Sequence, residues 1–191
     1  VMHDVTSHYK QQAIEAYPIS NWGLEEKKYG LCTIHRAENV DNQKKLEDIL
    51  SALSEVTNDI DIVLPLHPRT KQIIEKNGKS NLLDKFIITE PLSYLKMQSL
   101  ESSAKVIFTD SGGVQKEAYF HKIPCITLRE ETEWVETIDS GWNTLAGSDK
   151  KRIISSYFNL QYPAIHEEPY GDGNASKKFV DLLIKNHGYI S

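Results

Sequence analysis

The stretch Phe108–Phe120, "FTDSGGVQKEAYF", decides the fold because a buried strand passes straight into a helix across two glycines. The apolar residues before Asp110 have the character of a strand, and the residues after Gly113 have helical spacing. A strand followed at once by a helix is the repeating unit of α/β proteins. The stretch therefore predicts an α/β fold with a polar turn at the end of one strand.

The same alternation continues outward in both directions. Strand-like runs are separated by amphipathic helical stretches, and these runs read "YGLCTIH", "DIVLPLH", "KFIITEP", "KVIFTDS", "PCITL" and "WNTLAG". Their apolar residues are continuous rather than alternating, which is typical of strands covered on both faces. We therefore predict a doubly wound parallel sheet of six strands, a Rossmann-like domain over residues 24–159.

The two ends of the chain fall outside this alternation. Residues 1–23 begin with a predicted helix, and residues 160–191 are a polar loop followed by the helical stretch "ASKKFVDLLIKNHGYI". Such helices could cap this domain or pack on a neighbour. Because the first residue is Val1 rather than methionine, we expect a longer protein. The residues alone do not decide between these two possibilities.

Composition excludes several classes of protein. The chain has 191 residues, is 39% hydrophobic and carries a formal charge of −5 without a long basic block, which argues against nucleic-acid or anionic-membrane partners. No stretch is apolar enough for a membrane span or a signal peptide, so we expect a cytoplasmic location. Cys32 and Cys125 lie in apolar runs and are interpreted as buried thiols, and no spacing suggests a metal site.

Four polar clusters follow predicted strands: His35–Asn39, His67–Arg69, Thr109–Gly113 and Arg129–Glu133. In an open parallel sheet, ligands bind at the carboxyl ends of the strands, where the strand order reverses. We therefore expect these clusters to converge on one crevice.

The cluster at Ser111, Gly112 and Gly113 opens a helix. The first N–H groups of a helix lack internal partners and attract anions, and glycine allows a phosphate to approach the backbone. Glu117, one turn further on, could accept hydrogen bonds from both hydroxyls of a ribose. The alternative is an ordinary turn capped by Asp110 or Ser111, with Glu117 as a surface acid. The stretch matches neither the GxxxxGK[ST] nor the GxGxxG pattern.

Taken singly, each of the other clusters allows both a functional and a structural interpretation. His35 and Arg36 could hold a phosphate or move a proton, and His67 has the same ambiguity at an ordinary helix start. The acidic run after Arg129 is typical of a solvated helix start, although Arg129, Thr132 and Glu133 could line the pocket, with Arg129 facing negative charge on the ligand. The remaining histidines are interpreted as structural or exposed.

Taken together, the segments "HRAENVDN", "LPLHPRT", "TDSGGVQKEA", "IPCITLREETEW" and "YGDGNAS" resemble non-hydrolysing UDP-N-acetylglucosamine 2-epimerases in order and spacing. The resemblance covers nearly the whole chain but only the C-terminal half of the usual family member. It implies a glycosyltransferase-B-like architecture of two Rossmann-like domains, in which this chain is the second, UDP-gripping domain. By the same resemblance, residues 1–23 would be a helix and linker from a missing first domain, and residues 160–191 would pack back towards that domain.

The resemblance also implies roles for individual residues. Ser111, Gly112 and Gly113 would hold the diphosphate, Glu117 the ribose and Met97 the uracil, with Arg36 also contacting UDP. His35 would have a catalytic role, and Glu38, Asn39, His67, Arg129, Thr132 and Glu133 would lie near the sugar and phosphates. The implied chemistry is anti elimination and re-addition of UDP, interconverting UDP-GlcNAc and UDP-ManNAc or a close UDP-2-acetamido sugar. No cofactor is required, a UDP-sugar is the partner, and we expect a homodimer of the full-length protein.

Some residues depart from the family pattern. Ala37 replaces the second arginine of "HRREN", which puts a regulatory second-ligand site in doubt. Trp134 replaces an arginine and resembles the branch acting on UDP-2,3-diacetamido-2,3-dideoxy-glucuronate, or archaeal-type relatives. The family's first-domain carboxylates are absent from these residues, so we expect the isolated chain to bind UDP weakly without epimerising.

Two alternatives remain open. The nearest is a glycosyltransferase of the same architecture, but its retaining members commonly carry a glutamate eight positions before the ribose-binding one, where this chain has Thr109. The other is a non-catalytic nucleotide-sugar binding module.

Overall fold

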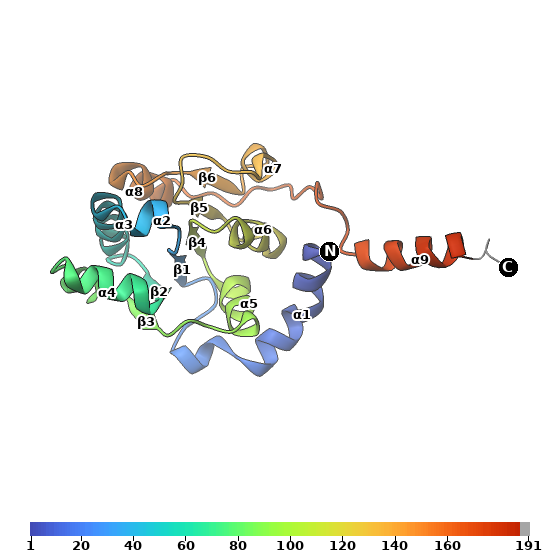
Figure 1. The fold of residues 1–191 in the computed structure, drawn as a ribbon, viewed down its shortest axis with the longest axis horizontal. Coiled ribbons are helices and arrows are strands. Elements are labelled where there is room, and N and C mark those ends of the chain that lie inside the picture. Colours follow the sequence, from blue (N-terminus) through green and yellow to red (C-terminus); the bar gives the residue numbers. More distant parts are fainter. Residues whose placement is uncertain (188–191) are drawn as a thin grey trace.

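The computed structural model describes residues 1–187 and contains one six-stranded parallel sheet (Figure 1). Its strands are β1 (Tyr29–Thr33), β2 (Asp61–Pro65), β3 (Ile87–Thr89), β4 (Val106–Thr109), β5 (Cys125–Thr127) and β6 (Asn143–Leu145). They lie in the order β3-β2-β1-β4-β5-β6, and every neighbouring pair is parallel. The predicted doubly wound sheet is confirmed, and its order reverses between β1 and β4.

The predicted helices are also present. They are α1 (Met2–Ala16), α2 (Ala37–Val40), α3 (Gln43–Val56), α4 (Pro68–Lys76), α5 (Tyr94–Ser103), α6 (Gly112–His121), α7 (Val135–Asp139), α8 (Lys150–Phe158) and α9 (Ala175–His187). Short 3-10 turns cover Ile19–Trp22 and Ser80–Leu83. In α4, Pro68 occupies the first turn and Gly78 follows the helix end with a positive φ of 65°, as their conformational preferences predict.

Side chains of the central strands alternate between two apolar cores. Cys32, Phe108 and Ile126 point to a core that α3, α4 and α8 close with residues such as Leu50 and Ile153. The neighbouring residues Leu31, Ile107 and Cys125 point to the opposite core, which α5 and α6 close with Leu100 and Ala118. Both faces of the sheet are therefore covered, which explains why the strand sequences are continuously apolar.

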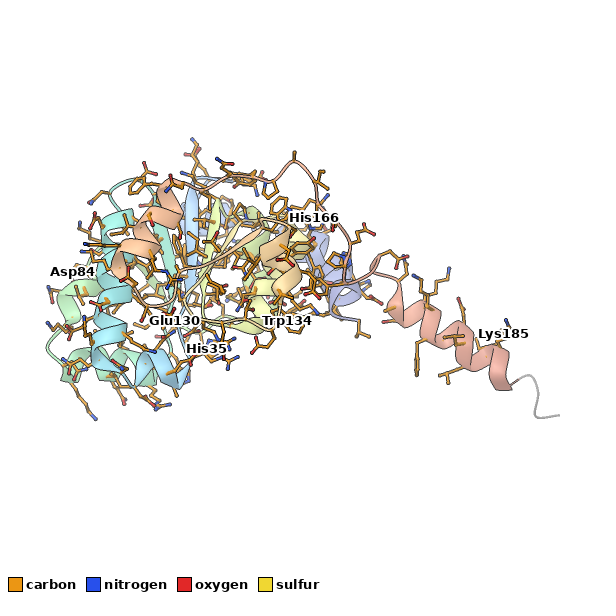
Figure 2. The ribbon with its side chains drawn as sticks, turned by 90° about the horizontal axis from the view of Figure 1, so that it is seen from above. His35, Asp84, Glu130, Trp134, His166 and Lys185 are labelled. Atoms are coloured by element: carbon orange, nitrogen blue, oxygen red, sulfur yellow. The ribbon has the colours of Figure 1, made fainter. Side chains whose placement is uncertain are left out.

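Helix α1 adds a further layer because it packs on α5 and α6 (Figure 1). Ala13 is fully buried there, and the Ser99 hydroxyl of α5 donates to the Tyr17 carbonyl at 2.6 Å. Helix α9 instead stands away from the domain body, as its Lys185 shows in Figure 2. Its apolar side chains Phe179, Leu182 and Ile184 are 57–68% exposed.

No helix within residues 1–187 combines the length and apolar character needed to cross a bilayer. In the same part of the chain, no three His, Cys, Asp or Glu side chains are grouped as metal ligands would be.

Candidate functional site

Asp110, at the end of β4, ties together the loops at the switch point of the sheet. Its fully buried carboxylate accepts hydrogen bonds from the backbone N–H groups of His35 (3.1 Å) and Arg36 (3.0 Å), and from Asn39 Nδ2 (3.1 Å). The His35 ring Nδ1 lies 3.3 Å from the same carboxylate, while the side chain stays 56% exposed. Asn39 Nδ2 also donates to the Leu128 carbonyl after β5. The Asp110 carboxylate thus connects the loops that follow β1 and β4, and Asn39 extends this connection to the loop after β5.

The predicted phosphate turn lies beside this carboxylate at the start of α6. Ser111 is the N-cap, and its hydroxyl accepts from the Val114 N–H at 3.5 Å. The Ser111 N–H itself donates to Thr109 Oγ1 at 2.9 Å. Among the described hydrogen bonds, neither Gly112 nor Gly113 acts as an amide donor. The sequence therefore placed the turn correctly, but two amides and the Ser111 hydroxyl, rather than three amides, are available to an anion.

Trp134, in the loop before α7, supports the same turn. Its indole Nε1 donates to the Gly112 carbonyl at 2.8 Å, and a Cβ on Gly112 would lie 3.2 Å from that nitrogen. The Lys116 ammonium lies 4.3 Å from the ring centres of both Trp134 and Tyr170. A side chain at position 112 would therefore require Trp134 to move by a few tenths of an ångström, which is a packing reason for glycine in addition to phosphate approach.

Glu117 lies one turn into α6, facing the start of α5. It is largely buried, and burial raises the pKa of its carboxyl to about 7, although a hydrogen bond from the Tyr94 hydroxyl acts in the opposite direction. Met97 is partly buried against the core that α5 and α6 close, with Leu92 and Val114. Glu117 is therefore not the solvated surface acid of the alternative interpretation.

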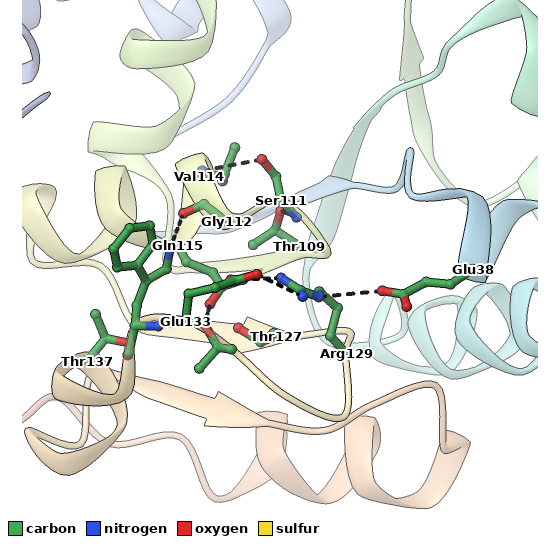
Figure 3. A network of polar contacts seen from close by, with 12 residues as sticks. Glu38, Thr109, Ser111, Gly112, Val114, Gln115, Thr127, Arg129, Glu133 and Thr137 are labelled. Carbon is green, nitrogen blue, oxygen red and sulfur yellow. Dashed lines mark hydrogen bonds and ion pairs between the residues drawn. The ribbon is translucent and has the colours of Figure 1, made fainter.

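The Arg129 guanidinium is already paired with two acids (Figure 3). Glu133 accepts from Arg129 through two hydrogen bonds of 3.0 and 3.1 Å, and Glu38 Oε1 lies 3.4 Å from Arg129 Nε. These contacts, first of all the one with Glu133, raise the pKa of Arg129. In the described structure this positive charge joins the loop after β5 to α2, and the expectation that Arg129 faces negative charge on a ligand stays a prediction.

The Thr132 hydroxyl is hydrogen-bonded within the protein. It donates to Gln115 Oε1 at 2.6 Å and accepts from the Trp134 N–H at 3.1 Å. Gln115 also accepts from Asn143 Nδ2 of β6 at 3.2 Å. Thr132 is therefore placed by the structure as a support of the loop that carries Trp134.

His67 and Arg36 are exposed at the same edge of the sheet. His67 is the N-cap of α4, where its Nδ1 accepts from the Arg69 N–H at 3.2 Å. Arg69 pairs with Asp41, just after α2, at 2.7 Å. The four predicted clusters thus occupy neighbouring loops. Asp110 and Trp134 are the organising residues that sequence analysis missed, because no local pattern marks their contacts with distant segments.

Comparisons with known proteins agree with this arrangement. A family model described as UDP-N-acetylglucosamine 2-epimerase matches residues 1–184. A UDP-N-acetylglucosamine 2-epimerase homolog from Methanococcus maripaludis is 48% identical over 84% of this chain and 45% of its own length. The UDP-2,3-diacetamido-2,3-dideoxy-D-glucuronate 2-epimerase of Pseudomonas aeruginosa is 37% identical over 97% of this chain and 51% of its own.

A solved structure shows the same similarity in three dimensions. The UDP-GlcNAc 2-epimerase of Methanocaldococcus jannaschii, in complex with UDP-GlcNAc and UDP, superimposes with a TM-score of 0.83 and 34% identity. The match covers 96% of this chain and 53% of that one. The chain therefore spans about half the length of the relatives that it matches. By sequence and by structure, it belongs to the UDP-N-acetylglucosamine 2-epimerase family.

Proposed function

We propose that this chain is the nucleotide-binding half of a UDP-N-acetylglucosamine 2-epimerase. The observation that carries the proposal is the turn at Gly112 and Gly113, whose amides are free for an anion beside the His35 loop fixed by Asp110. The glycine turn after β4 and His35 after β1 lie together where the strand order reverses. Doubly wound proteins bind nucleotides at this point of the sheet. Family membership and a relative solved with UDP-GlcNAc and UDP support the same ligand.

Each residue would have a distinct task in this reaction. The Gly112 and Gly113 amides and the Ser111 hydroxyl hold the diphosphate, Glu117 binds the ribose and Met97 lies against the uracil. When UDP leaves C1 by anti elimination, negative charge grows on the diphosphate, and preorganised donors stabilise it. The Asp110 carboxylate holds the backbone of His35, and His35 has a catalytic role beside the diphosphate and sugar.

The remaining chemistry needs groups that these residues do not supply. Removal of the C2 proton requires a base facing His35, and we assign it to a preceding domain of the full-length protein. Residues 1–23 then form the helix and linker after that domain, 24–159 the UDP-binding domain, and 160–191 the loop and helix that return towards it. The full-length enzyme is proposed to be a homodimer.

Exchange of the C2 proton in deuterated water tests the function directly. Full-length protein incubated with UDP-GlcNAc should exchange the C2 proton and form the manno epimer, both visible by NMR. The H35Q variant should lose most of this exchange, while H8Q, altered at an exposed histidine of α1, should retain it. Sugar transfer to an acceptor without C2 exchange would contradict the proposal and indicate a glycosyltransferase.

Trp134 and the Pseudomonas aeruginosa relative favour a second substrate for the same reaction. Exchange with the UDP-2,3-diacetamido-uronate but not with UDP-GlcNAc would assign the protein to that branch.

A further inference from the structure

A segment without helix or strand, residues 161–171, lies against helix α6. We call it the strap, and it runs from α8 back across the domain towards α9 (Figure 1). Tyr119 of α6 holds the strap twice, because its hydroxyl donates to the Glu167 carbonyl at 2.8 Å and its own carbonyl lies 2.8 Å from His166 Nε2. The strap ends at Tyr170 and Gly171, which open the stretch "YGDG". None of the residue roles proposed above uses this stretch.

Tyr170 is the residue of the strap that reaches the first half of α6. The Lys116 ammonium of α6 lies 4.3 Å from the ring centre of Tyr170 and 4.3 Å from that of Trp134. The two rings meet edge to face with their centres 6.1 Å apart. The Tyr170 hydroxyl donates to Glu136 Oε2 of α7 at 2.9 Å, which orients its ring. A cation is attracted to aromatic faces, so Lys116 holds the indole and the phenol together.

Contacts with α1 and α6 fix the same end of the strap. The His3 ring of α1 stacks on Phe120 of α6, with the ring centres 4.5 Å apart. His3 Nδ1 also lies 2.8 Å from the carbonyl of Gly171, the residue after Tyr170. Gly171 has a φ of 85°, a backbone conformation that residues with a side chain rarely adopt. Tyr170 is thus held in place by α1, α6 and α7 together.

Trp134 connects this arrangement to the predicted phosphate turn. Its Nε1 donates to the Gly112 carbonyl at 2.8 Å. The Gly112 carbonyl and the Gly113 N–H belong to one planar peptide group, so the direction of one fixes the direction of the other. With glycine on both sides, rotation of this peptide group meets few steric limits. The hydrogen bond from Trp134 therefore determines where the Gly113 N–H points.

We propose that Tyr170 is a positioning residue for the diphosphate. Through Lys116 it keeps the Trp134 indole on the Gly112 carbonyl, and this keeps the Gly113 N–H directed at the anion. A donor that is aligned before the ligand arrives loses less free energy on binding than one that must first be ordered. This inference rests on the proposed function, because it requires a diphosphate on the turn.

Tyr162 provides a matched control, because it lies on the same strap and has the same kinds of contact. Its hydroxyl donates to the Lys105 carbonyl at 2.7 Å, the Lys27 ammonium lies 5.9 Å from its ring centre, and its ring meets that of Trp142 edge to face at 6.4 Å. These three partners precede β1, β4 and β6, so they lie at the edge of the sheet opposite to the turn. General loosening of the strap should therefore affect variants of both tyrosines.

The test measures the UDP affinity of variants of the 191-residue chain by NMR titration. Y170L and K116M should each weaken UDP binding roughly three- to fivefold, because the Gly113 N–H is less well aligned. Y162L should lose a similar amount of stability in urea while its UDP affinity stays within about twofold of wild type. K116R keeps a cation between the two rings and should retain most of the affinity.

Spectra of the ligand-free variants give a second readout. The ¹H–¹⁵N peaks of the Trp134 indole and the Gly113 amide should move in Y170L and in K116M, and should keep their positions in Y162L. In the Y170L/K116M double variant, the loss of UDP affinity should be smaller than the product of the two single losses, because both changes act through the same indole. Urea titration establishes whether Y170L is folded. If it is not, K116M decides, because unchanged affinity and an unmoved indole peak in K116M would remove the path from Tyr170 to the turn.

The inference and the proposed function fail in different ways. If wild type binds UDP and Y170L binds it equally well, or if Y170L and Y162L weaken binding to the same extent, Tyr170 has no positioning role and the proposed function stands. If wild type does not bind UDP, both fail together.

Discussion

Asp110 shows how one side chain organises the candidate site. It is fully buried, and its oxygens accept hydrogen bonds from three donors on the loop after β1. The position of His35 relative to the phosphate turn is therefore set by a residue that needs no ligand contact. Hydrogen bonds to a charged acceptor are stronger than neutral ones, and buried donors left unpaired are costly.

The D110N variant should lose stability and nucleotide binding together. An amide replaces one of the two acceptor oxygens with an N–H₂ group that faces an N–H donor, so the free energy of unfolding should fall by about 2–4 kcal/mol. Urea titration measures this change, and UDP titration by NMR measures the loss of binding. D48N, at a partly exposed acid paired with Lys44 on α3, should change stability by less than about 0.5 kcal/mol. Equal effects of the two variants would contradict this role of Asp110.

Glu117 makes stability depend on pH in a direction opposite to most acids. Its pKa is raised by burial from 4.5 to about 7, so the folded protein binds the proton more tightly than the unfolded chain. Its contribution to stability is complete below pH 4.5 and is lost as the pH rises through 7. E117Q lacks this dependence.

The stability of E117Q relative to wild type should therefore increase between pH 5 and pH 8, by about 2 kcal/mol. Urea unfolding of both proteins at several pH values measures the difference. The lowered pKa of His121 has the opposite effect between pH 3 and 6.5, but it is present in both proteins and cancels. A difference that is constant with pH would show that Glu117 is ordinarily solvated.

At the scale of elements, the start of α6 is held by the loop before α7. The Trp134 indole N–H donates to the Gly112 carbonyl. The Lys116 ammonium lies over the rings of both Trp134 and Tyr170. W134F should remove one hydrogen bond, lower stability by about 1 kcal/mol and weaken UDP binding roughly three- to tenfold, because the turn is less well fixed.

W142F is the matched control. The Trp142 indole also donates one hydrogen bond, to the Ile165 carbonyl at 3.1 Å, but on a segment that contacts Tyr119 in the last part of α6 rather than its first turn. Its loss of stability should be similar while UDP affinity stays unchanged. If both variants weaken UDP binding to the same extent, the effect is general loosening rather than a specific brace.

The order of elements could be predicted from sequence because apolar strands, helical spacing and turn residues agree locally. Gly78 and Pro68 mark the limits of α4 in this way. Contacts between distant segments could not be predicted. Nothing local distinguishes Asp110 from an ordinary helix cap, or Glu101 from a surface acid, because their burial depends on β1 and α1. The pairing of Arg129 with Glu38 could not be predicted for the same reason, because the two residues are 91 positions apart along the chain.

At the scale of the whole molecule, the two terminal helices differ in how they join the domain. Helix α1 packs closely on the domain, because its Thr6 and Ala13 are buried and it covers α5. Helix α9 is attached mainly at its first turn, where the Ser176 N–H donates to Asp4 Oδ2 at 2.6 Å. The Lys178 ammonium pairs with Asp172 of the preceding loop. Its apolar side chains contribute little burial within the described structure.

Removing each helix should therefore have very different consequences. A chain ending at Asn174 loses residues whose described side chains are exposed, so its free energy of unfolding should fall by less than about 1 kcal/mol. A chain lacking residues 1–17 exposes the apolar and polar side chains of α5, Glu101 among them, and should lose more than about 3 kcal/mol or fail to fold. Urea titrations of the two truncated chains measure both values. A large loss on removing α9 would show that this helix stabilises the described domain itself, and the proposed assignment of residues 160–191 to contacts with another domain would then be wrong.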